Sequence, residues 1–232
     1  MAEITGQNAE HLFRVLRVEP GQVFEISDNQ DLYLAEVETA RKSEVAFRVL
    51  EKLPANSKGV AITLWAALIK FDRFELLIEK ATELGVTAIR PFEATRTERG
   101  LAAASLKRRA RWEKIALEAS QQSRRIHLPR LEHSVRLKQA LAGEGDVRLL
   151  LDEDAGAVPI LDVLPETRAA SDQIALLLGP EGGWTDEERQ QAITVGWQPC
   201  SLAPTILRAE TAAMAALAVI QASWRESRKQ PA

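Results

Sequence analysis

The segment whose residue types most suggest chemistry is Gly179-Pro180-Glu181-Gly182-Gly183, where a run of Ile and Leu residues ends. Glycine allows the backbone to approach a ligand closely and to adopt positive φ angles. The segment lacks the Lys-Ser/Thr pair of a phosphate-binding P-loop, and its glycine spacing is not that of the dinucleotide fingerprint. Residues 174–188 contain no Lys or Arg but four acidic side chains, which favours a cationic ligand over a phosphate. S-adenosylmethionine, with its sulfonium and ammonium groups, fits this charge, and a plain strand-to-helix turn is the alternative.

A second loop, residues 201–208 (SLAPTILR), also joins a predicted strand to a helix. Pro204, Ile206 and Leu207 are apolar, so exposure to water disfavours them, and they suit the floor of an adenine pocket. Arg208 stands at the start of the next helix, where the helix dipole favours anions over cations. A residue that breaks a local rule is a candidate functional residue. An ion pair of Arg208 with Glu210 or Glu181 is the competing explanation.

Both loops need a scaffold, and from residue 60 onward apolar strands alternate with amphipathic helices, as in a parallel α/β sheet. In open sheets of this kind, ligands bind at the carboxyl ends of the strands, where both loops lie. Ser105 and Thr185 are the expected N-caps of two helices, and Glu188 completes a capping box with Thr185. The last helix is apolar nearly all round, which predicts that it is buried. The expected strands cover residues 60–69, 86–91, 147–154, 174–179 and 199–203, and the expected helices cover residues 72–84, 105–125, 185–196 and 209–224.

Residues 1–58 have a different pattern and are predicted to form a small β-rich domain, with the larger domain in residues 59–232. A helix is expected over residues 8–18, with Asn8 as its N-cap and Pro20-Gly21 after its end. The small domain holds seven Lys and Arg against ten Asp and Glu, so a nucleic acid would have to be bound by local basic clusters. Three strands are expected over residues 22–27, 32–38 and 43–53, followed by a linker over residues 54–59 (PANSKG).

Composition limits the class of protein. The chain has 232 residues, of which 46% are hydrophobic, and its one cysteine, Cys200, cannot form a disulfide within the chain. The N-terminus lacks an apolar signal core, and the longest apolar runs, such as residues 212–220, are too short to span a bilayer. His127 and His133 have no partner at metal-ligand spacing. We therefore expect a cytoplasmic protein without a metal site and without membrane association.

Two C-terminal segments, LLLGPEGGWTDEE (176–188) and SLAPTILRAETAA (201–213), together resemble the paired signature of the RsmE-type 16S rRNA uridine-N3 methyltransferases, a family of the SPOUT class. KFDRFELLIEKATELGV (70–86) and RWEKIALEASQQSRR (111–125) are similar to the upstream motifs of this family. EHLFRVLRVEPGQ (10–22) resembles its N-terminal RNA-binding domain, so the resemblance covers nearly the whole chain. It departs at the start, where family members carry a basic segment and a first strand with Arg and aromatic residues. That edge of the small domain is expected to be absent.

The resemblance implies a PUA-like β-barrel followed by an α/β-knot domain, in which the two loops form a deep trefoil knot that binds S-adenosylmethionine in a bent shape. It also implies a homodimer with active sites beside the subunit interface. One side of the cofactor would be lined by Leu178, Gly179, Glu181, Gly182 and Gly183. The other side would be lined by Leu202, Ala203, Ile206, Leu207, Arg208, Thr211 and Ala212.

Polar and basic side chains are the candidates for RNA contacts. His11, Arg14 and Arg17 lie three residues apart, on or near one face of the first predicted helix, which suits phosphate contacts. The alternative is a merely solvated helix face. The residues expected to face inward from this helix are Leu12, Val15 and Leu16. By resemblance, the RNA-binding set also includes Lys70, Arg73, Gln122 and Arg124, the last two facing the active-site cleft. The cluster Lys107, Arg108, Arg109, Arg111 and Lys114 either follows an RNA backbone or keeps its helix soluble.

The implied reaction is methyl transfer from S-adenosylmethionine to N3 of a specific uridine in 16S rRNA, within an assembled or nearly assembled small subunit. N3 of uracil carries a proton at neutral pH, so the proton must leave and the charge then spreads over the flanking carbonyl oxygens. Arg208 is the candidate for stabilising that charge, and Glu210, Glu181 or water is the candidate for accepting the proton. The alternatives are a SPOUT methyltransferase that acts on another RNA position and a non-catalytic RNA-binding assembly factor.

Overall fold

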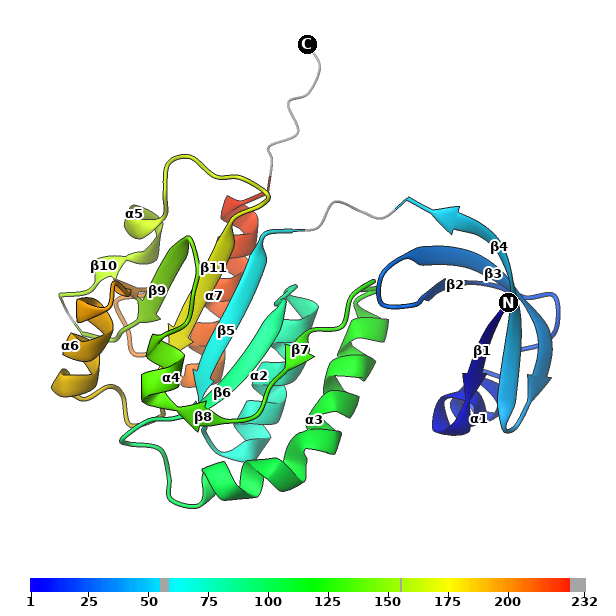
Figure 1. Cartoon of the computed structure of the whole chain (residues 1–232), viewed down its shortest axis with the longest axis horizontal. Coiled ribbons are helices and arrows are strands. Elements are labelled where there is room, and N and C mark those ends of the chain that lie inside the picture. Colours follow the sequence, from blue (N-terminus) through cyan, green and yellow to red (C-terminus); the bar gives the residue numbers. More distant parts are fainter. Residues whose placement is uncertain (55–58, 155, 226–232) are drawn as a thin grey trace, which may run out of the picture. The chain divides into compact units, whose positions relative to one another are not determined.

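The computed structural model describes residues 1–54, 59–154 and 156–225 (Figure 1). The chain divides into two compact units, Met1–Ser57 and Lys58–Ala232. Most of the linker expected over residues 54–59 lies outside the described residues, and the domain boundary after residue 58 stays a prediction. None of the described helices is long and apolar enough to cross a membrane.

The N-terminal unit consists of β1 (Ala2–Thr5), α1 (Gly6–Arg14), β2 (Val23–Ser27), β3 (Leu32–Arg41) and β4 (Glu44–Leu53). The strands form a curled antiparallel sheet in the order β1-β4-β3-β2. Ala9 of α1 packs with Val37 and Phe47 of the sheet in a small core. Shifts of register between β3 and β4 increase the twist and bend of the sheet. Because β1 and β2 are edges, the PUA-like barrel takes the form of an open half-barrel among the described residues.

The first strand, expected to be absent, is present. β1 pairs with β4, and Ala2 lies opposite Phe47 while Thr5 lies opposite Glu44. Ala2 and Ile4 pack against the core of the unit. Four residues are too few to show a two-residue period, so only the pairing with β4 identifies this strand.

Helix α1 differs from its prediction at both ends. Thr5 takes the N-cap position, so Asn8 lies inside the helix, and the helix ends at Arg14 instead of residue 18. Val15 and Leu16 follow the helix and are 64% and 57% exposed, so the expectation that they face inward is wrong. Because β1 leads directly into α1, the helix starts earlier than the sequence pattern indicates.

The C-terminal unit is built on one parallel sheet. Its strands are β5 (Ala61–Ala67), β6 (Ala88–Glu93), β7 (Arg130–Leu131), β8 (Val135–Arg136), β9 (Val147–Leu151), β10 (Val158–Pro159), β11 (Gln173–Leu178) and β12 (Gln198–Ser201). The strand order is β10-β12-β9-β11-β5-β6-β7, and β8 also pairs with β6. All these pairings are parallel.

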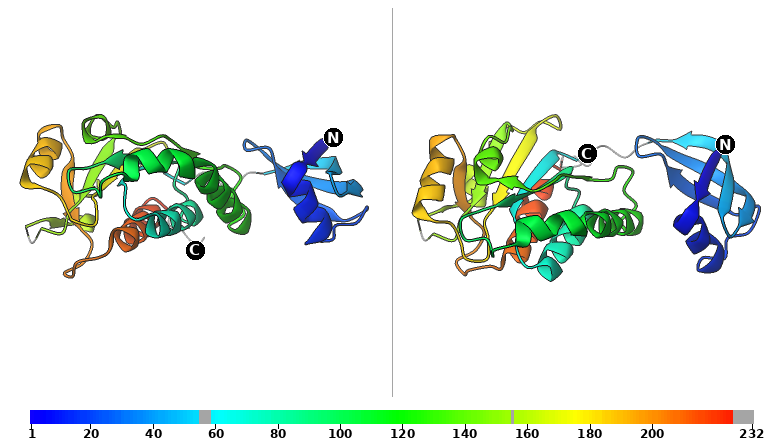
Figure 2. Two further views of the ribbon diagram at one scale, coloured as in Figure 1. Left: turned by 90° about the horizontal axis from the view of Figure 1, so that it is seen from below. Right: turned by 60° about the horizontal axis from the view of Figure 1, so that its bottom comes forward.

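Helices cover both faces of this sheet (Figure 2). They are α2 (Phe71–Glu83), α3 (Leu101–Gln122), α4 (Leu137–Leu141), α5 (Ile160–Val163), α6 (Asp186–Thr194) and α7 (Ala209–Ser223). α2, α3 and α7 share one core with the sheet, whereas α4 and α6 pack on the other side. In β11, Leu176 and Leu178 belong to the first core and Ala175 and Leu177 to the second. A strand buried on both faces explains the continuous apolar run in the sequence.

The long strands and helices predicted for this unit are present, but two predictions need correction. α3 begins at Leu101 with Gly100 as its N-cap, so Ser105 is not a cap. Ser105 lies inside the helix, where its Oγ donates a hydrogen bond to the carbonyl oxygen of Ala102 (2.7 Å). α7 is buried along one face only: Leu217 is buried, whereas Ala218 is exposed.

Candidate active site

A cavity of about 280 Å³ lies at the carboxyl ends of β9, β11 and β12, beside the first turn of α7. β9 stands between β11 and β12 in the parallel sheet, so the loops that follow these three strands meet at one edge. The lining comprises Leu151, Asp152 and Glu153 after β9; Leu178, Gly179, Pro180, Glu181 and Gly183 after β11; Cys200, residues 202–209 and Ala212 around β12 and α7; and Arg73 of α2.

Ten of the twelve residues expected to contact the cofactor line this cavity. The exceptions are Gly182, whose carbonyl oxygen accepts a hydrogen bond from Arg96 (2.8 Å), and Thr211, which is exposed on α7. Asp152 and Glu153 also line the cavity and are not among the predicted residues. They follow β9, a predicted strand, but no local pattern shows that this strand lies beside β11. Contact of the twelve predicted residues with a cofactor stays a prediction.

The loop after β11 is packed as closely as glycine permits at two positions. Gly183 has a φ of 70°, in the left-handed region, and its N–H donates to the carbonyl oxygen of Pro180 (2.9 Å). A Cβ atom at Gly183 would overlap Oε1 of Glu153. A Cβ atom at Gly179 would lie 2.9 Å from the indole of Trp184. The glycines of this segment therefore bring the backbone against the neighbouring loop, as well as against the cavity.

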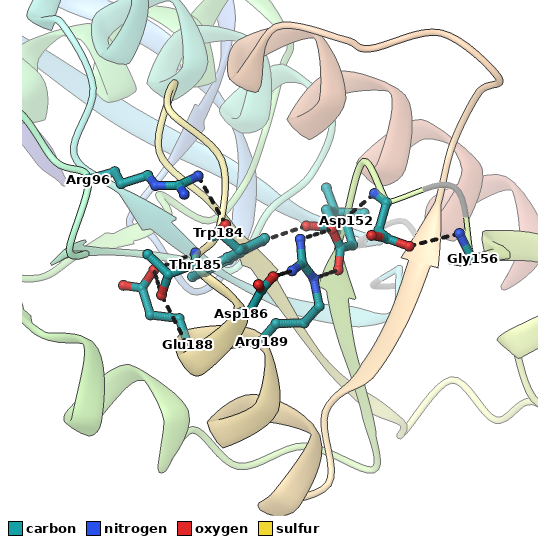
Figure 3. Close-up of polar contacts among 10 residues, drawn as sticks. Arg96, Asp152, Gly156, Trp184, Thr185, Asp186, Glu188 and Arg189 are labelled. Carbon is teal, nitrogen blue, oxygen red and sulfur yellow. Dashed lines mark hydrogen bonds and ion pairs between the residues drawn. The ribbon is translucent and has the colours of Figure 1, made fainter.

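The start of α6 is tied to the loop after β6 through Glu188, whose contact with Thr185 is drawn in Figure 3. The predicted capping box is confirmed: the N–H of Glu188 donates to Oγ1 of Thr185, and the Glu188 carboxylate accepts from the N–H of Thr185. The other carboxylate oxygen accepts from the N–H of Thr95 (2.8 Å). Burial raises the pKa of Glu188, but the hydrogen bonds from Thr95 and Thr185 together lower it by more. The pKa therefore lies below the ordinary value of 4.5. The ionised carboxylate thus joins two loops.

Arg96 and Trp184 fix the same loop from two sides. Arg96 Nη1 donates to the carbonyl oxygens of Gly182 (2.8 Å) and Trp184 (3.2 Å), as Figure 3 shows for Trp184. The indole Nε1 of Trp184 donates to the carbonyl oxygen of Leu151 (2.8 Å), and its ring stacks on Phe92. Because these partners lie at the carboxyl ends of β6 and β9, the shape of the loop after β11 depends on both of those strands.

Asp152 lines the cavity, and its carboxylate is held by α6. Arg189 Nε donates to Oδ2 (2.5 Å) and Arg189 Nη2 donates to Oδ1 (3.1 Å), while the Asp152 side chain is 1% exposed (Figure 3). This hydrogen bonding raises the pKa of Arg189 above its already high ordinary value, and burial opposes the shift. A second carboxylate, Asp186, accepts from Nη1 of Arg189 (2.8 Å) at the surface. Asp152 is therefore already neutralised by a protein cation.

Glu181 is not the bare carboxylate that its glycine-rich segment suggests. Its Oε1 forms an ion pair with Nη1 of Arg73, in the first turn of α2. The two residues are separated by 108 positions in the sequence, and the fold brings them together at the cavity, which both of them line. Arg73, expected to bind RNA, is thus engaged with the loop after β11.

Arg208 occupies the N-cap position of α7 and is exposed beside the cavity. Its side chain forms no ion pair or hydrogen bond with any residue in the described part of the chain. Neither competing ion pair is observed, since Glu181 pairs with Arg73 and Glu210 does not reach Arg208. Glu210 is 6% exposed, lies outside the cavity lining, and its Oε2 has no hydrogen-bond partner among the described residues.

Cys200 contributes an apolar wall to the cavity. Burial raises the pKa of its thiol to about 12, with a further contribution from the charge of Asp152, so the thiol is protonated at neutral pH. Across residues 1–54, 59–154 and 156–225, no group of three or more His, Cys, Asp or Glu side chains is placed to hold a metal ion.

Comparison with known proteins gives the family. Residues 56–221 match the model of an RNA methyltransferase domain, and residues 4–50 match that of an RNA methyltransferase PUA domain. A protein of Synechocystis sp. named Ribosomal RNA small subunit methyltransferase E is 36% identical, over 94% of this chain and 72% of its own length. The protein of the same name from Bacillus subtilis is 31% identical, over 94% of this chain and 88% of its own length. The chain belongs to the ribosomal RNA small subunit methyltransferase E family.

Solved structures of similar proteins agree with this membership of the methyltransferase E family. A putative methyltransferase from Legionella pneumophila, in complex with S-adenosylmethionine, has a TM-score of 0.85 and 31% identity, covering 96% of this chain and 91% of that one. The Ribosomal RNA small subunit methyltransferase E of Neisseria gonorrhoeae, also bound to S-adenosylmethionine, has a TM-score of 0.86 and 30% identity, covering 96% and 92%. The resemblance stated from the sequence and the predicted fold class are thereby confirmed.

In the N-terminal unit of this methyltransferase E family member, the predicted RNA-binding residues do not share one helix face. His11 and Arg14 are exposed on α1, and Arg14 pairs with Glu10 (3.0 Å). Arg17 follows the helix and has a φ of 50°, in the left-handed region, so it leaves the direction of the helix. The expected spacing of three along one face is therefore wrong for Arg17.

In the C-terminal unit, the predicted RNA-binding residues lie at opposite ends of the helices. Lys70 is exposed at the N-cap of α2, on the same turn as Arg73 and the cavity. Gln122 and Arg124 are exposed at the end of α3. The neighbouring Arg125 donates to carbonyl oxygens at the end of α2 and before β6, which is the amino edge of the sheet. Within one chain, Gln122 and Arg124 therefore do not face the cavity.

Proposed function

We propose that this protein transfers a methyl group from S-adenosylmethionine to N3 of a specific uridine in the 16S rRNA of the small ribosomal subunit. One observation carries the proposal: the loops after β11 and β12 line a single cavity in a chain whose relatives, along 94% of its length, are named Ribosomal RNA small subunit methyltransferase E. Methylation at another RNA position and a non-catalytic role in ribosome assembly are the alternatives.

The cavity fits S-adenosylmethionine in size and in charge. Its volume of about 280 Å³ is close to the lower end of the range for small-molecule sites, roughly 300–1,000 Å³. Leu178, Leu202 and Leu207 supply apolar walls for an adenine ring. Two of the three carboxylates in the lining are paired with Arg189 and Arg73, whereas Glu153 has no ion pair among the described residues and is available for a positively charged group of the ligand. The relatives from Legionella and Neisseria contain this cofactor in their solved structures.

When bound, the cofactor supplies an electrophilic methyl group on a positively charged sulfur. The chain must then orient the uracil and stabilise the negative charge on its carbonyl oxygens. Arg208 suits this role because it borders the cavity and its guanidinium is not engaged by another described residue. Its planar fork of donors can reach two acceptors, and an apolar surrounding strengthens the interaction. We assign the stabilisation of the uracil anion to Arg208.

The proton on N3 needs an acceptor, and neither predicted carboxylate is a free base at the cavity. Glu181 is paired with Arg73, and Glu210 is buried outside the lining. We propose that water takes the proton while Arg208 stabilises the anion that forms. In this scheme Glu210 does not accept the proton. It stabilises the start of α7, because the helix dipole favours an acidic residue in the first turn.

RNA contacts in this proposal come from both units. Lys70, exposed at the N-cap of α2, would hold a phosphate near the target uridine, and Arg73 would do so through the guanidinium donors that its ion pair with Glu181 leaves free. The N-terminal unit would contribute His11, Arg14 and Arg17. Gln122 and Arg124, at the amino edge of the sheet, would contact RNA away from the site of their own chain. Contacts spread over two units suit an extended surface, as in an assembled or nearly assembled small subunit.

We further propose a homodimer that acts in the cytoplasm, where ribosomes are assembled. α7 carries the partly exposed Met214 and Val219, and Ile206 beside the cavity is 83% exposed. Contact with a second subunit would remove these apolar groups from water. Sedimentation should then find a dimer at micromolar concentration, and a monomer at that concentration would refute this part of the proposal.

The experiment that tests the reaction uses the full chain, labelled S-adenosylmethionine and small subunits that lack the modification. The label should enter 16S rRNA and map to N3 of one uridine. A label on another position or another RNA would establish the first alternative. Cofactor binding without any transfer would establish the assembly factor.

A further inference from the structure

The charged groups that line the cavity differ in whether the protein already neutralises them. Asp152 is held by two hydrogen bonds from Arg189, and Glu181 forms an ion pair with Arg73. Glu153, the third carboxylate of the lining, has no ion pair or hydrogen bond within the described ranges of the chain. Among the carboxylates of the lining, Glu153 is therefore the one that is left for a ligand.

Among the described residues, the hydrogen bonds of the turn after β9 involve the side chains on either side of Glu153 and not Glu153 itself. The N–H of Asp154 donates to Oδ1 of Asp152 (3.1 Å), and the N–H of Gly156 donates to Oδ1 of Asp154 (2.8 Å). Both flanking aspartates are thus occupied by the turn itself (Figure 3). Glu153 between them is exposed and directed at the loop after β11.

A second observation places the Glu153 carboxylate at the cofactor loop. Its Oε1 lies so close to Gly183 that a Cβ atom at that position would overlap it. Gly183 also has a positive φ, so glycine serves both the turn and the approach of the carboxylate. Arg96, which also approaches Gly183, directs Nη1 to the carbonyl oxygens of Gly182 and Trp184 and forms no ion pair with Glu153.

We infer that Glu153 recognises the positive charge on the methionine half of S-adenosylmethionine, an inference that rests on the proposed function. The cofactor carries a sulfonium, an ammonium and a carboxylate, so its net charge is positive. S-adenosylhomocysteine, the product, lacks the sulfonium charge, and methylthioadenosine has no charge on the same adenosine framework. An unpaired carboxylate in the lining stabilises the first ligand most and the last least.

The test is calorimetric titration of the full chain and of Glu153→Gln with these three ligands. The substitution keeps the size of the side chain and removes its charge. S-adenosylmethionine should bind about tenfold more weakly to the variant, the effect of removing one ionic contact that ligand binding shields from water. The affinity for methylthioadenosine should change by less than about twofold. The affinity of S-adenosylhomocysteine shows which group of the cofactor Glu153 contacts. The substitution should weaken its binding as much as that of S-adenosylmethionine if the contact is with the ammonium group, and should leave it unchanged if the contact is with the sulfonium.

Asp154→Asn is the matched control, because it removes a charge of the same sign one residue away and keeps an acceptor for the N–H of Gly156. It should leave all three affinities within about twofold, since Asp154 is not part of the cavity lining. Unchanged binding of S-adenosylmethionine to Glu153→Gln would overturn the inference, and so would an equal loss for methylthioadenosine. Failure of the unmodified chain to bind S-adenosylmethionine would instead overturn the proposed function, and the inference with it.

Discussion

Replacing Arg208 by alanine should raise or preserve stability while it removes most of the methyl transfer. Arg208 is exposed at the N-cap of α7, makes no side-chain cap and has no ion pair within the described residues, so its removal breaks no stabilising contact. A cation at the positive end of a helix is unfavourable by about 0.3–1 kcal/mol. For a chain of 232 residues, each kcal/mol corresponds to roughly 2–4 °C in melting temperature. The Ala variant should therefore melt at the same temperature or up to about 4 °C higher.

The effect on catalysis should have the opposite sign. Losing one donor that stabilises a developing anion lowers the rate of the chemical step by about 10²–10³. Arg208→Lys should restore little of this rate, because a point charge cannot replace a planar fork of donors. Arg208→Ser should be the most stable variant, since serine adds a cap to an α7 start that has no side-chain cap, worth about 0.5–2 kcal/mol relative to alanine. It should still be as slow as the Ala variant.

Three measurements on the same preparations separate stability from chemistry: thermal melting, calorimetric affinity for S-adenosylmethionine, and single-turnover transfer to undermethylated small subunits. Cofactor affinity should stay within a few-fold, because the proposed partner of Arg208 is the uracil. Normal single-turnover transfer by a stable Ala variant would remove Arg208 from the mechanism. A large fall in melting temperature would show that the side chain has a structural partner instead.

Four further predictions concern other parts of the structure. Gly183→Ala should weaken cofactor binding in calorimetry more than Gly182→Ala. Of the two positions only Gly183 has a positive φ, which strains an alanine there by about 1–2 kcal/mol, and the added Cβ displaces Glu153. Equal losses of affinity would contradict this. Arg189→Met should lower the free energy of unfolding, measured in urea, by about 3–5 kcal/mol, because it leaves the buried carboxylate of Asp152 unpaired. Asp186→Asn, which breaks the exposed ion pair of the same arginine, should lower it by less than about 1 kcal/mol. Glu188 has a lowered pKa, so it stabilises the fold above pH 4.5 and loses this effect as the pH falls through its folded pKa; acid titrations of stability should be flatter for Glu188→Gln. Joint replacement of Arg14 and Arg17 by Ala should reduce the salt dependence of RNA binding by about one unit of slope per lost phosphate contact, and an unchanged slope would assign both to the solvated surface.

Much of the larger unit is determined by the sequence locally. The capping box of Thr185 and Glu188 and the apolar run of β11 are patterns of neighbouring residues, and the structure contains both. The two loop segments around Gly183 and Arg208 also carry enough local information to indicate a ligand and a family. These features are readable because helix caps, strand burial and glycine geometry depend on residues a few positions apart.

Helix ends and very short elements are less well determined by sequence. Ser105 has the composition of a cap, but α3 continues through it because Gly100 supplies the start of the helix. β1 has four residues and is held by pairing with β4, which lies far along the chain, and by packing of Ala2 and Ile4 on the core. In both cases a contact elsewhere outweighs the local preference.

Only the tertiary structure decides which charges in the cavity are available. Strand order places β9 between β11 and β12, which brings Asp152 and Glu153 to a loop whose sequence gives no sign of them. The same arrangement pairs Glu181 with Arg73, and it leaves Arg208 without the carboxylate partners expected for it. The sequence alone does not show which of these charged side chains are paired. Their chemical roles differ because ion pairs form between groups that the fold brings within a few ångströms, whatever their separation along the chain.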